Sequence, residues 1–276
     1  MEFFEQFEEQ DEIIPSPFNY TGSKFKLVKT LRSHFPTESG SFYDLFAGGG
    51  SVFVNNLFFD KIYVNDKIKP LISFYTYLQK TPWEEVIESI KKKNIEKNDP
   101  EAYCKLRHRF NKNSSYIDFF ILICSCTNNM MRFNKKFKFN QTFGKRNFNP
   151  NTEKKLKKYH NLIYKNDKII FTNNNFIDIT PEPNSFVYLD PPYLITEAGY
   201  NAYWSKDLEN KFYDYVDTLN NLGVKFMVSN VAEHKGKKNP HISRLQKYKI
   251  IDIDFNYNKV SRNGVSNSKE IIVVNY

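Results

Sequence analysis

The chain has 276 residues, and its 40 lysines and arginines against 31 aspartates and glutamates give a formal net charge of +9. This length suits one core with a smaller appended module, and the charge favours a polyanionic partner, although an ordinary Lys-rich protein has the same balance. The longest apolar run, Phe119 to Cys124, is too short to span a bilayer.

Cysteine and histidine usage bears on location and metals. Two of the three cysteines, Cys124 and Cys126, lie in an apolar segment, which indicates reduced thiols in a cytosolic protein. The five histidines are scattered, so no zinc-type spacing exists and no metal is expected. The acidic, aromatic stretch from Met1 to Glu12 is unlike a signal or transit peptide, which also favours a cytoplasmic protein.

Short apolar runs predict seven strands, which alternate with helical patterns in most of the chain. The predicted strands are Phe42–Phe46, Ile62–Val64, Ile169–Phe171, Phe186–Leu189, Lys225–Val228, Ile250–Phe255 and Ile271–Val274. Such alternation predicts an α/β fold with a mostly parallel sheet covered by helices on both faces. Only a polar loop joins the last two strands, so we expect them to pair as an antiparallel hairpin.

Helices are predicted both between the strands and in a long stretch without strand signal. Those between strands are Val52–Phe59, Ile68–Leu78, Asp207–Asn221 and His241–Lys247. The long stretch contains Trp83–Lys92, Glu101–Asn111 and Tyr116–Cys126, followed by a basic, aromatic segment from Met130 to Asn149. We therefore expect a tail (1–16), a sheet domain (17–68 and 160–276) and an inserted, mainly helical module with a β-hairpin (69–159).

Glycines and acids follow the first two strands. Gly48, Gly49 and Gly50 come directly after the first strand, and Ser51 is a candidate N-cap for the next helix. Glycines at this switch from strand to helix let a ligand approach the backbone closely. The second strand ends at Asp66, 18 residues beyond Gly48, where an acid can accept hydrogen bonds from ribose hydroxyls. Each feature alone is also typical of a plain turn or a solvated acid.

The fourth predicted strand ends in Asp190-Pro191-Pro192-Tyr193. The two prolines cannot continue a strand or a helix, so a carboxylate, a proline carbonyl and an aromatic face are held at the sheet edge. Two acceptors and a stacking surface suit a flat ring that carries an amino group. A strand-terminating turn is the ordinary alternative for such a short motif.

Taken in order, these motifs resemble those of the Dam-type DNA adenine-N6 methyltransferases, with the closest similarity to compact bacteriophage and restriction-associated members. The resemblance runs from about Pro17 to Tyr276, and the glycine turn precedes Asp190-Pro-Pro-Tyr193 as in the alpha arrangement. It implies a seven-stranded Rossmann-like methyltransferase sheet. It also implies methyl transfer from S-adenosylmethionine (AdoMet) to N6 of an adenine flipped out of duplex DNA, with Asp190, Pro191, Pro192 and Tyr193 as the catalytic residues.

The resemblance further assigns a set of cofactor-binding residues: Tyr20, Lys24, Asp44, Phe46, Gly48, Gly50, Ser51, Asp66, Phe176, Asp178, Asp190 and Tyr200. Asp66 would hold the ribose hydroxyls, Phe176 would pack on the cofactor's adenine, and Asp178 would accept from its amino group. By pattern alone Asp178 is equally a helix cap or turn acid, and Tyr200, in a loop that closes over the site in the family, is equally a surface tyrosine.

The basic, aromatic segment is a candidate DNA-reading element, or alternatively a solvated hairpin whose phenylalanines pack inward. The resemblance favours DNA contacts by Asn128, Arg132, Asn134, Lys136, Thr142, Lys145 and Arg146. Arg132 matches an arginine that reads a guanine, whereas Thr142 stands where the family often has proline. That departure leaves the family's usual GATC target open, and a related short site is the alternative.

Three functions remain open at this point. The first is the duplex-DNA adenine methyltransferase, acting with a cognate restriction endonuclease in the same bacterial or phage system and present as a monomer or weak dimer. The second is a methyltransferase for another planar amine, such as cytosine N4 or an RNA adenine. The third is a catalytically inactive DNA-binding relative. Asp190 and the basic insert favour the first.

Overall fold

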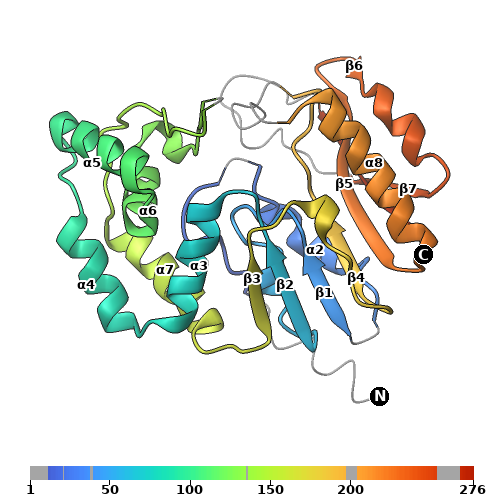
Figure 1. The fold of residues 1–276 in the computed structure, drawn as a ribbon, viewed down its shortest axis with the longest axis horizontal. Helices are drawn as coiled ribbons and strands as arrows, with labels where there is room; N and C mark the ends of the chain where they lie inside the picture. Colours follow the sequence, from blue (N-terminus) through green and yellow to red (C-terminus); the bar gives the residue numbers. More distant parts are fainter. Residues whose placement is uncertain (1–11, 21, 38–39, 135, 197–203, 254–267) are drawn as a thin grey trace.

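One mixed β-sheet organises the computed structural model of the chain, which describes residues 12–20, 22–37, 40–134, 136–196, 204–253 and 268–276 (Figure 1). Within these residues the eight strands lie in the order β3-β2-β1-β4-β5-β8-β7, with β6 paired to β5. The strands are β1 (Ser41–Asp44), β2 (Lys61–Asn65), β3 (Ile169–Thr172), β4 (Phe186–Leu189), β5 (Lys225–His234), β6 (Lys237–Lys238), β7 (Lys249–Ile253) and β8 (Ser268–Val274).

The strand directions confirm most of the sequence prediction. The pairs formed among β1 to β5 are all parallel. The β8 strand pairs antiparallel with both β5 and β7, so the predicted C-terminal pairing is confirmed. The sequence did not predict β6. This strand pairs with Glu233 and His234, which belong to the part of β5 that continues six residues beyond its predicted end at Val228. A turn with positive φ at Lys235 and Gly236 then joins β5 to β6.

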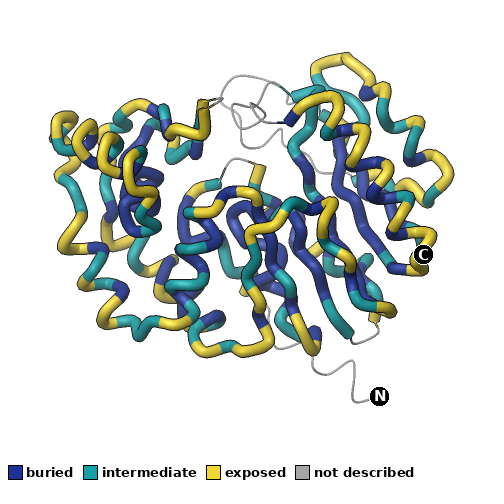
Figure 2. Tube along the Cα trace, in the orientation of Figure 1, coloured by how far each residue is buried: buried dark blue, intermediate teal, exposed yellow. Residues whose placement is uncertain are grey.

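Alternate residues of the central strands face opposite apolar layers. Phe42 and Tyr188 belong to the core cluster that includes α2 and the inserted helices. Tyr43 and Leu189 belong to a second cluster built mainly against α8. Because both faces of the sheet are buried, the strands read as continuous apolar runs in the sequence (Figure 2).

The helices cover the sheet unevenly: α4, α5 and α6 group together on one side of the molecule, away from α8 (Figure 1). The α-helices are α2 (Val28–Arg32), α3 (Lys69–Lys80), α4 (Trp83–Lys93), α5 (Pro100–Asn113), α6 (Tyr116–Ser125), α7 (Pro150–Ile163) and α8 (Lys206–Asn221). The 3₁₀ turns are η1 (Phe25–Leu27), η2 (Phe53–Asn55), η3 (Thr127–Asn129), η4 (Phe176–Asp178) and η6 (Pro240–Leu245).

Local capping explains where the inserted helices begin. The Asp99 and Ser115 side chains accept backbone N–H bonds at the starts of α5 and α6. Asn149 caps α7 in the same way, with Pro150 at its first position. The α7 helix was missed from the sequence, although Asn149-Pro150 is a standard helix-start signal.

Two predicted helices are wrong. Val52–Phe59 contains only the single turn η2, because the Asn55 and Asn56 side chains donate to the Ser51 and Val52 carbonyls at 2.7 Å. These amide side chains satisfy carbonyls that helix N–H groups would otherwise bind, and Ser51 makes no N-cap bond. His241–Lys247 is likewise replaced by the 3₁₀ turn η6.

The inserted helices share one apolar cluster with a face of the sheet. The α6 helix lies at the centre of this cluster, and its residues 117–125 are all buried (Figure 2). No helix among the described residues has the length and apolar character that crossing a membrane requires. The shared cluster does not mark a boundary between sheet and insert, so the division at 69–159 stays a prediction.

In place of the predicted β-hairpin, the insert has two isolated antiparallel bridges within its described residues, Cys126 with Phe143 and Phe133 with Phe139. The Phe133–Phe139 bridge lies inside the Cys126–Phe143 bridge along the chain, but no continuous ladder joins the two. Phe133 and Phe139 pack edge to face, with ring centroids 5.6 Å apart. Two backbone bonds flank the pair: the Asn134 N–H donates to the Lys138 carbonyl at 3.0 Å, and the Asn140 N–H donates to the Arg132 carbonyl at 3.1 Å.

Candidate active site

A cavity of about 270 Å³ lies where the parallel strands end, between the turns that follow β1, β2, β3 and β4. The chain crosses from one side of β1 to the other in this sheet, so the cavity occupies the usual ligand position of an open α/β sheet. Four residues near the N-terminus, Tyr20, Gly22, Ser23 and Lys24, complete its wall together with Phe137 and Trp204.

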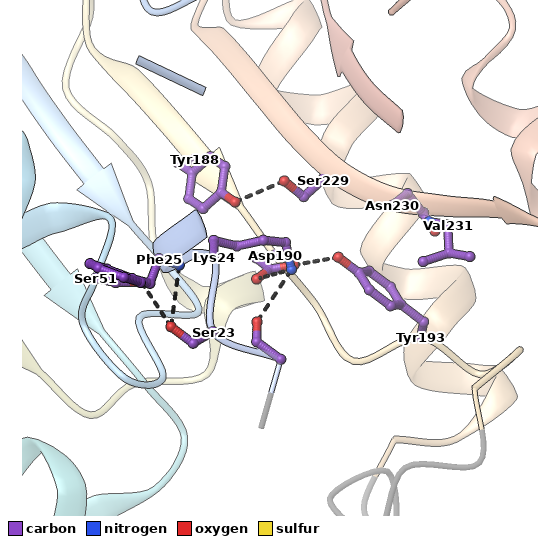
Figure 3. Close-up of polar contacts among 11 residues, drawn as sticks. Ser23, Lys24, Phe25, Ser51, Tyr188, Asp190, Tyr193, Ser229, Asn230 and Val231 are labelled. Atoms are coloured by element: carbon purple, nitrogen blue, oxygen red, sulfur yellow. Dashed lines mark hydrogen bonds and ion pairs between the residues drawn. The ribbon is translucent and has the colours of Figure 1, made fainter. Parts of the chain in front are cut away.

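Asp190, directly after β4, is held from two sides (Figure 3). Lys24 Nζ donates to Asp190 Oδ2 at 2.8 Å and lies 5.4 Å from the Tyr193 ring centroid. The Tyr193 hydroxyl donates to Asp190 Oδ1. Burial and, second, the charge of Asp190 raise the pKa of Tyr193 well above its usual value, so this hydroxyl remains a hydrogen-bond donor.

The prolines and the strand below them fix the direction of this carboxylate. Pro191 is buried and Pro192 half-buried in the cavity wall. Tyr188, at the end of β4, contributes its ring to the cavity, and its hydroxyl lies 2.8 Å from Ser229 Oγ on β5 (Figure 3). The Asp190 side chain is 16% exposed and lines the cavity.

The glycine turn is shaped by packing as much as by ligand access. Gly48 has φ +48°, and a Cβ there would lie 2.8 Å from the Tyr20 ring. At Gly50, with φ +73°, a Cβ would lie 2.1 Å from the Tyr159 hydroxyl. Gly48 lines the cavity and Gly50 does not, so the cofactor assignment of Gly50 has no geometric support.

Asp66 connects the turn to the start of α3. Its Oδ2 accepts the Gly48 N–H and its Oδ1 accepts the Ile68 N–H, each at 2.9 Å. Burial raises the pKa of the Asp66 carboxyl, and these backbone bonds act against the shift. Ser51 also lines the cavity, with its hydroxyl 3.3 Å from that of Ser23.

Asp44 differs from the other acids because neither carboxylate oxygen has a hydrogen-bond partner among the described residues. The side chain is 1% exposed and lines the cavity. Burial, followed by the charges of Asp190 and Asp66, raises the pKa of Asp44 well above its usual range. Unpartnered buried carboxylates are costly, so this residue indicates a ligand that supplies donors or positive charge.

An aromatic group forms another part of the wall. The Phe46 ring lies 5.1 Å from the Phe176 centroid and 5.9 Å from Trp204. The Trp204 indole N–H donates to the buried Glu209 on α8, which fixes the ring against the cavity. Asp178 is exposed and is not part of the lining, and Tyr200 lies outside the described residues.

The charge of the lining distinguishes between ligand classes. The three carboxylates of Asp44, Asp66 and Asp190 line the cavity together with two lysines, Lys24 and Lys67. Lys24 is already paired with Asp190. A ligand that carries a positive charge with hydroxyl and amino donors would satisfy these carboxyl groups. No cluster of three metal-ligating side chains occurs in the part of the chain that the structure describes.

Sequence comparison identifies the family of the chain. The model of the D12 class N6 adenine-specific DNA methyltransferases matches residues 20–258, which include the N-terminal segment, the glycine turn and Asp190. The chain belongs to this family.

Individual proteins similar to this chain are also DNA methylases or methyltransferases by name. Modification methylase StsI of Streptococcus sanguinis is 32% identical over 282 residues, which cover 95% of this chain and 43% of that protein. Type II methyltransferase M.FokI of Planomicrobium okeanokoites is 34% identical with the same coverage. A Vibrio cholerae DNA adenine methylase is 26% identical over 91% of each chain. The chain thus spans less than half the length of the first two relatives.

Many polar side chains of the basic segment, Met130 to Arg146, bond within the protein. Arg132 donates through Nε to Asn140 Oδ1 and through Nη2 to the Asn140 carbonyl, both at 3.0 Å. These bonds occupy two of the five guanidinium N–H donors. Asn134 Oδ1 accepts the N–H groups of Lys136 and Lys138, so this side chain holds the turn.

The other predicted DNA contacts gather near η3. Asn128, Thr142, Lys145 and Arg146 are all exposed. The Thr142 hydroxyl lies 2.9 Å from Thr127 Oγ1, and Arg146 donates to Asn129 at 2.8 Å. Lys136 is also exposed, at the tip of the segment. These positions are compatible with a nucleic-acid surface, but their DNA contacts stay predictions.

More than half of the lining residues were not among the predicted site residues, and Trp204, Lys67 and Phe137 are examples. Trp204 lies four residues after Tyr200, and Lys67 follows Asp66 directly, so each is close in sequence to a predicted cofactor residue. Phe137 had no such signal, because nothing in the sequence places the insert's tip against the end of β4. Only the tertiary structure brings it there.

Proposed function

We propose that this chain transfers a methyl group from AdoMet to N6 of an adenine extruded from duplex DNA. The observation that carries the proposal is a single cavity in which the unpartnered Asp44 carboxylate and the Asp190-Pro191 acceptors lie together. The first would hold a cationic, donor-rich cofactor, and the second would hold an amine. Membership of the adenine-specific family gives that amine its identity.

The cavity lining fits AdoMet by chemistry. Its ammonium, ribose hydroxyls and adenine would meet Asp44, Asp66 and the Phe46–Phe176–Trp204 rings, and we infer that Tyr20, Lys24, Gly48 and Ser51 complete this binding site. When bound, the cofactor supplies an electrophilic methyl group on sulfur. Two of the predicted cofactor residues, Asp178 and Gly50, are not part of the lining, and a third, Tyr200, lies outside the described residues.

The chain's own residues would orient the amine. The N6 lone pair is delocalised into the purine, so the amine is a weak nucleophile. The Asp190 carboxylate and the Pro191 carbonyl would accept hydrogen bonds from the two N6 hydrogens and direct the lone pair toward the methyl group. The new N–C bond would form as the sulfur–methyl bond breaks with its electron pair left on sulfur, and N6 would release one proton to water. Lys24 and Tyr193 already bind Asp190, so the arriving amine has to share or displace one of these contacts.

We propose further that residues 69–159 act as the target-recognition part, with the Met130–Arg146 segment against DNA and Arg132 at a guanine. Extruding the adenine costs a few kcal/mol, which stacking on Tyr193 would partly offset. The target site, GATC or another short sequence, and a cognate restriction endonuclease belong to this proposal. The monomeric or weakly dimeric state belongs to it as well.

Transfer of tritium from labelled AdoMet to DNA, RNA and protein tests the reaction directly. Label should enter duplex DNA as N6-methyladenine, and profiling of methylated positions in DNA exposed to the chain should give one short site. Label in cytosine, in RNA or in protein would contradict the adenine assignment. Binding of AdoMet without any transfer would support the inactive relative instead.

A further inference from the structure

A second hollow, of about 470 Å³, lies where the N-terminal segment meets the insert. Three cations, Lys97, Arg146 and Lys155, contribute to its lining. Five asparagines line it as well, and no carboxylate of the described residues does. A concave surface with cations and neutral amides but without acids favours an anionic ligand.

Two of these cations are not neutralised by the protein. Lys97, in the connection between α4 and α5, and Lys155, on α7, are both exposed. Within the described part of the chain neither ammonium group forms a hydrogen bond or an ion pair. Arg146 donates one bond, from Nη1 to Asn129 Oδ1 at 2.8 Å. Like charges around one hollow repel each other, so a bound anion would stabilise this arrangement.

The neutral lining adds donors that suit an oxyanion. Asn147, Asn151 and Thr152 line the hollow, and their side chains make no hydrogen bond to another described residue. Amide NH2 and hydroxyl groups can each donate to an anionic oxygen. A phosphate offers several acceptor oxygens and forms its strongest bonds with charged donors, so it can use both kinds of group together.

The hollow adjoins both parts of the proposed DNA site. Asn19 lines the hollow, and the next residue, Tyr20, lines the cavity around Asp190. Arg146 is the last residue of the Met130–Arg146 segment and also lines the hollow. Consecutive Cα atoms are only about 3.8 Å apart, so a strand with one base in the cavity brings its phosphates near the hollow. About half or more of protein–DNA hydrogen bonds go to phosphate and sugar, so a base-binding cavity needs backbone contacts beside it.

We propose that this hollow binds a backbone phosphate of duplex DNA through Lys97 and Lys155 while the target base enters the cavity. The inference rests on the proposed function and adds to it a phosphate site, formed jointly by the N-terminal segment, α7 and the connection before α5. The phosphate is the same in every sequence, so the hollow contributes affinity and register without choosing the target.

The test removes the two cations singly and together, with Lys97→Ala, Lys155→Ala and the double variant. Lys154→Ala is the matched control, because Lys154 is the adjacent residue of α7 and is exposed and unpaired within the described chain, but does not line the hollow. Lys155→Arg keeps the charge. Alanine and arginine are both good helix formers, so the α7 variants should melt close to wild type.

Binding of duplex DNA is measured by fluorescence anisotropy over a range of salt concentrations. A lysine that neutralises one phosphate contributes about 0.9 to the slope of log K against log[salt], so each single alanine variant should make the slope shallower by about that amount. Between about 1 M and about 0.1 M salt, this change corresponds to an affinity loss of about eightfold. The loss should be equal for all sequences, and the double variant should lose about twice the slope. Lys154→Ala and Lys155→Arg should match wild type, and AdoMet affinity by calorimetry should not change.

A wild-type slope in the double variant, or an equal change in Lys154→Ala, would overturn the phosphate site, while methyl transfer by the wild-type chain would keep the proposed function intact. A loss that differs between sequences would reassign the two lysines to base reading and would overturn it as well. If the wild-type chain transfers no methyl to DNA but the slope depends on Lys97 and Lys155 as expected, the phosphate site stands and the proposed function fails.

Discussion

The cavity at the sheet edge and the Met130–Arg146 segment are built from contacts of very different range. In the cavity, Lys24 meets Asp190 across 166 residues of chain, and Gly48 meets Asp66 across 18. In the segment, Arg132 meets Asn140 across only eight residues. The cavity geometry thus depends on the whole fold, whereas the segment combines short-range bonds with bonds to α5, such as Asn111 Nδ2 to the Phe139 carbonyl at 3.0 Å.

This difference matches what each region is proposed to do. Chemistry needs acceptors held within a fraction of an ångström, and the parallel strands supply that rigidity. Recognition has to differ from one target site to another, and a segment whose described hydrogen bonds run to itself and to the inserted helices can change sequence without disturbing the sheet. Substitutions in the cavity should therefore abolish or weaken the reaction, and substitutions in the segment should redirect it.

Replacement of Asp190 should have the largest effect. Asp190→Ala removes one of the two proposed N6 acceptors, so methyl transfer should fall by about 10²–10³ while DNA binding is retained. Asp207→Ala is a matched control, because Asp207 also pairs with a lysine at 2.8 Å but is exposed on α8. Single-turnover transfer of labelled methyl measures both. Turnover of Asp190→Ala within about tenfold of wild type would contradict the assignment.

Arg132 tests the recognition segment. A bidentate guanidinium contact to guanine contributes about 1–3 kcal/mol of discrimination, so Arg132→Ala should relax the target at one base. Lys136→Ala should weaken binding to all sequences alike and lower its salt dependence. Because Asn140 holds the guanidinium, Asn140→Ala separates a structural role from a reading role.

Methylation profiling across all adenine contexts decides between these roles. Relaxation by Arg132→Ala alone supports base reading. A uniform loss in every context, shared by Asn140→Ala, would show that Arg132 only holds the segment together.

The sequence predicted the sheet well because both of its faces are buried. Apolar runs such as Phe186–Leu189 leave little alternative to a strand, and the seven predicted strands are all present. The glycine turn and the acids at strand ends were also predictable, since parallel strands bring their carboxyl ends together. The position of Asp44 in the cavity follows from the same rule.

The sequence predictions failed where side chains compete with the backbone for hydrogen bonds, or where segments distant in the sequence pack together. Asn55 and Asn56 bind carbonyls that a helix would have used, so the predicted helix after Ser51 does not form. The packing of Tyr159 against Gly50 joins α7 to the turn, and no local pattern signals it. Phe137 reaches the cavity only through the fold of the entire insert.

Asp66 should show a mixed effect on binding and folding. Asp66→Ala removes the proposed ribose acceptor and also leaves the Gly48 and Ile68 N–H groups without their bonds. AdoMet affinity should fall, and the free energy of unfolding should drop by about 1–3 kcal/mol. Calorimetric titration and denaturant unfolding measure the two quantities. Asp178→Ala serves as the exposed comparison, and a larger loss of AdoMet affinity there than at Asp66 would reverse the two assignments.

Replacement of Asp44 should have the smallest effect. Unlike the replacement of Asp66, it should raise the free energy of unfolding. Its carboxylate oxygens have no hydrogen-bond partner among the described residues, and burial raises its pKa, so the folded protein holds this proton more tightly than the unfolded chain. The contribution of Asp44 to stability therefore falls as pH rises from its usual pKa of 3.8 toward the raised value in the folded state. Asp44→Asn removes this dependence.

The variant without ligand should consequently be more stable than wild type at neutral pH, by about 1 kcal/mol, and the difference should shrink as pH falls toward 4. Denaturant unfolding at several pH values measures it, with Asp207→Asn as an exposed control that should change little at any pH. In wild type, AdoMet binding should release a proton, because a cationic ligand favours the ionised carboxyl. Titration in buffers of different ionisation enthalpy detects that proton. A stability difference that does not vary with pH, or binding without proton release, would mean that Asp44 is charged before the ligand arrives.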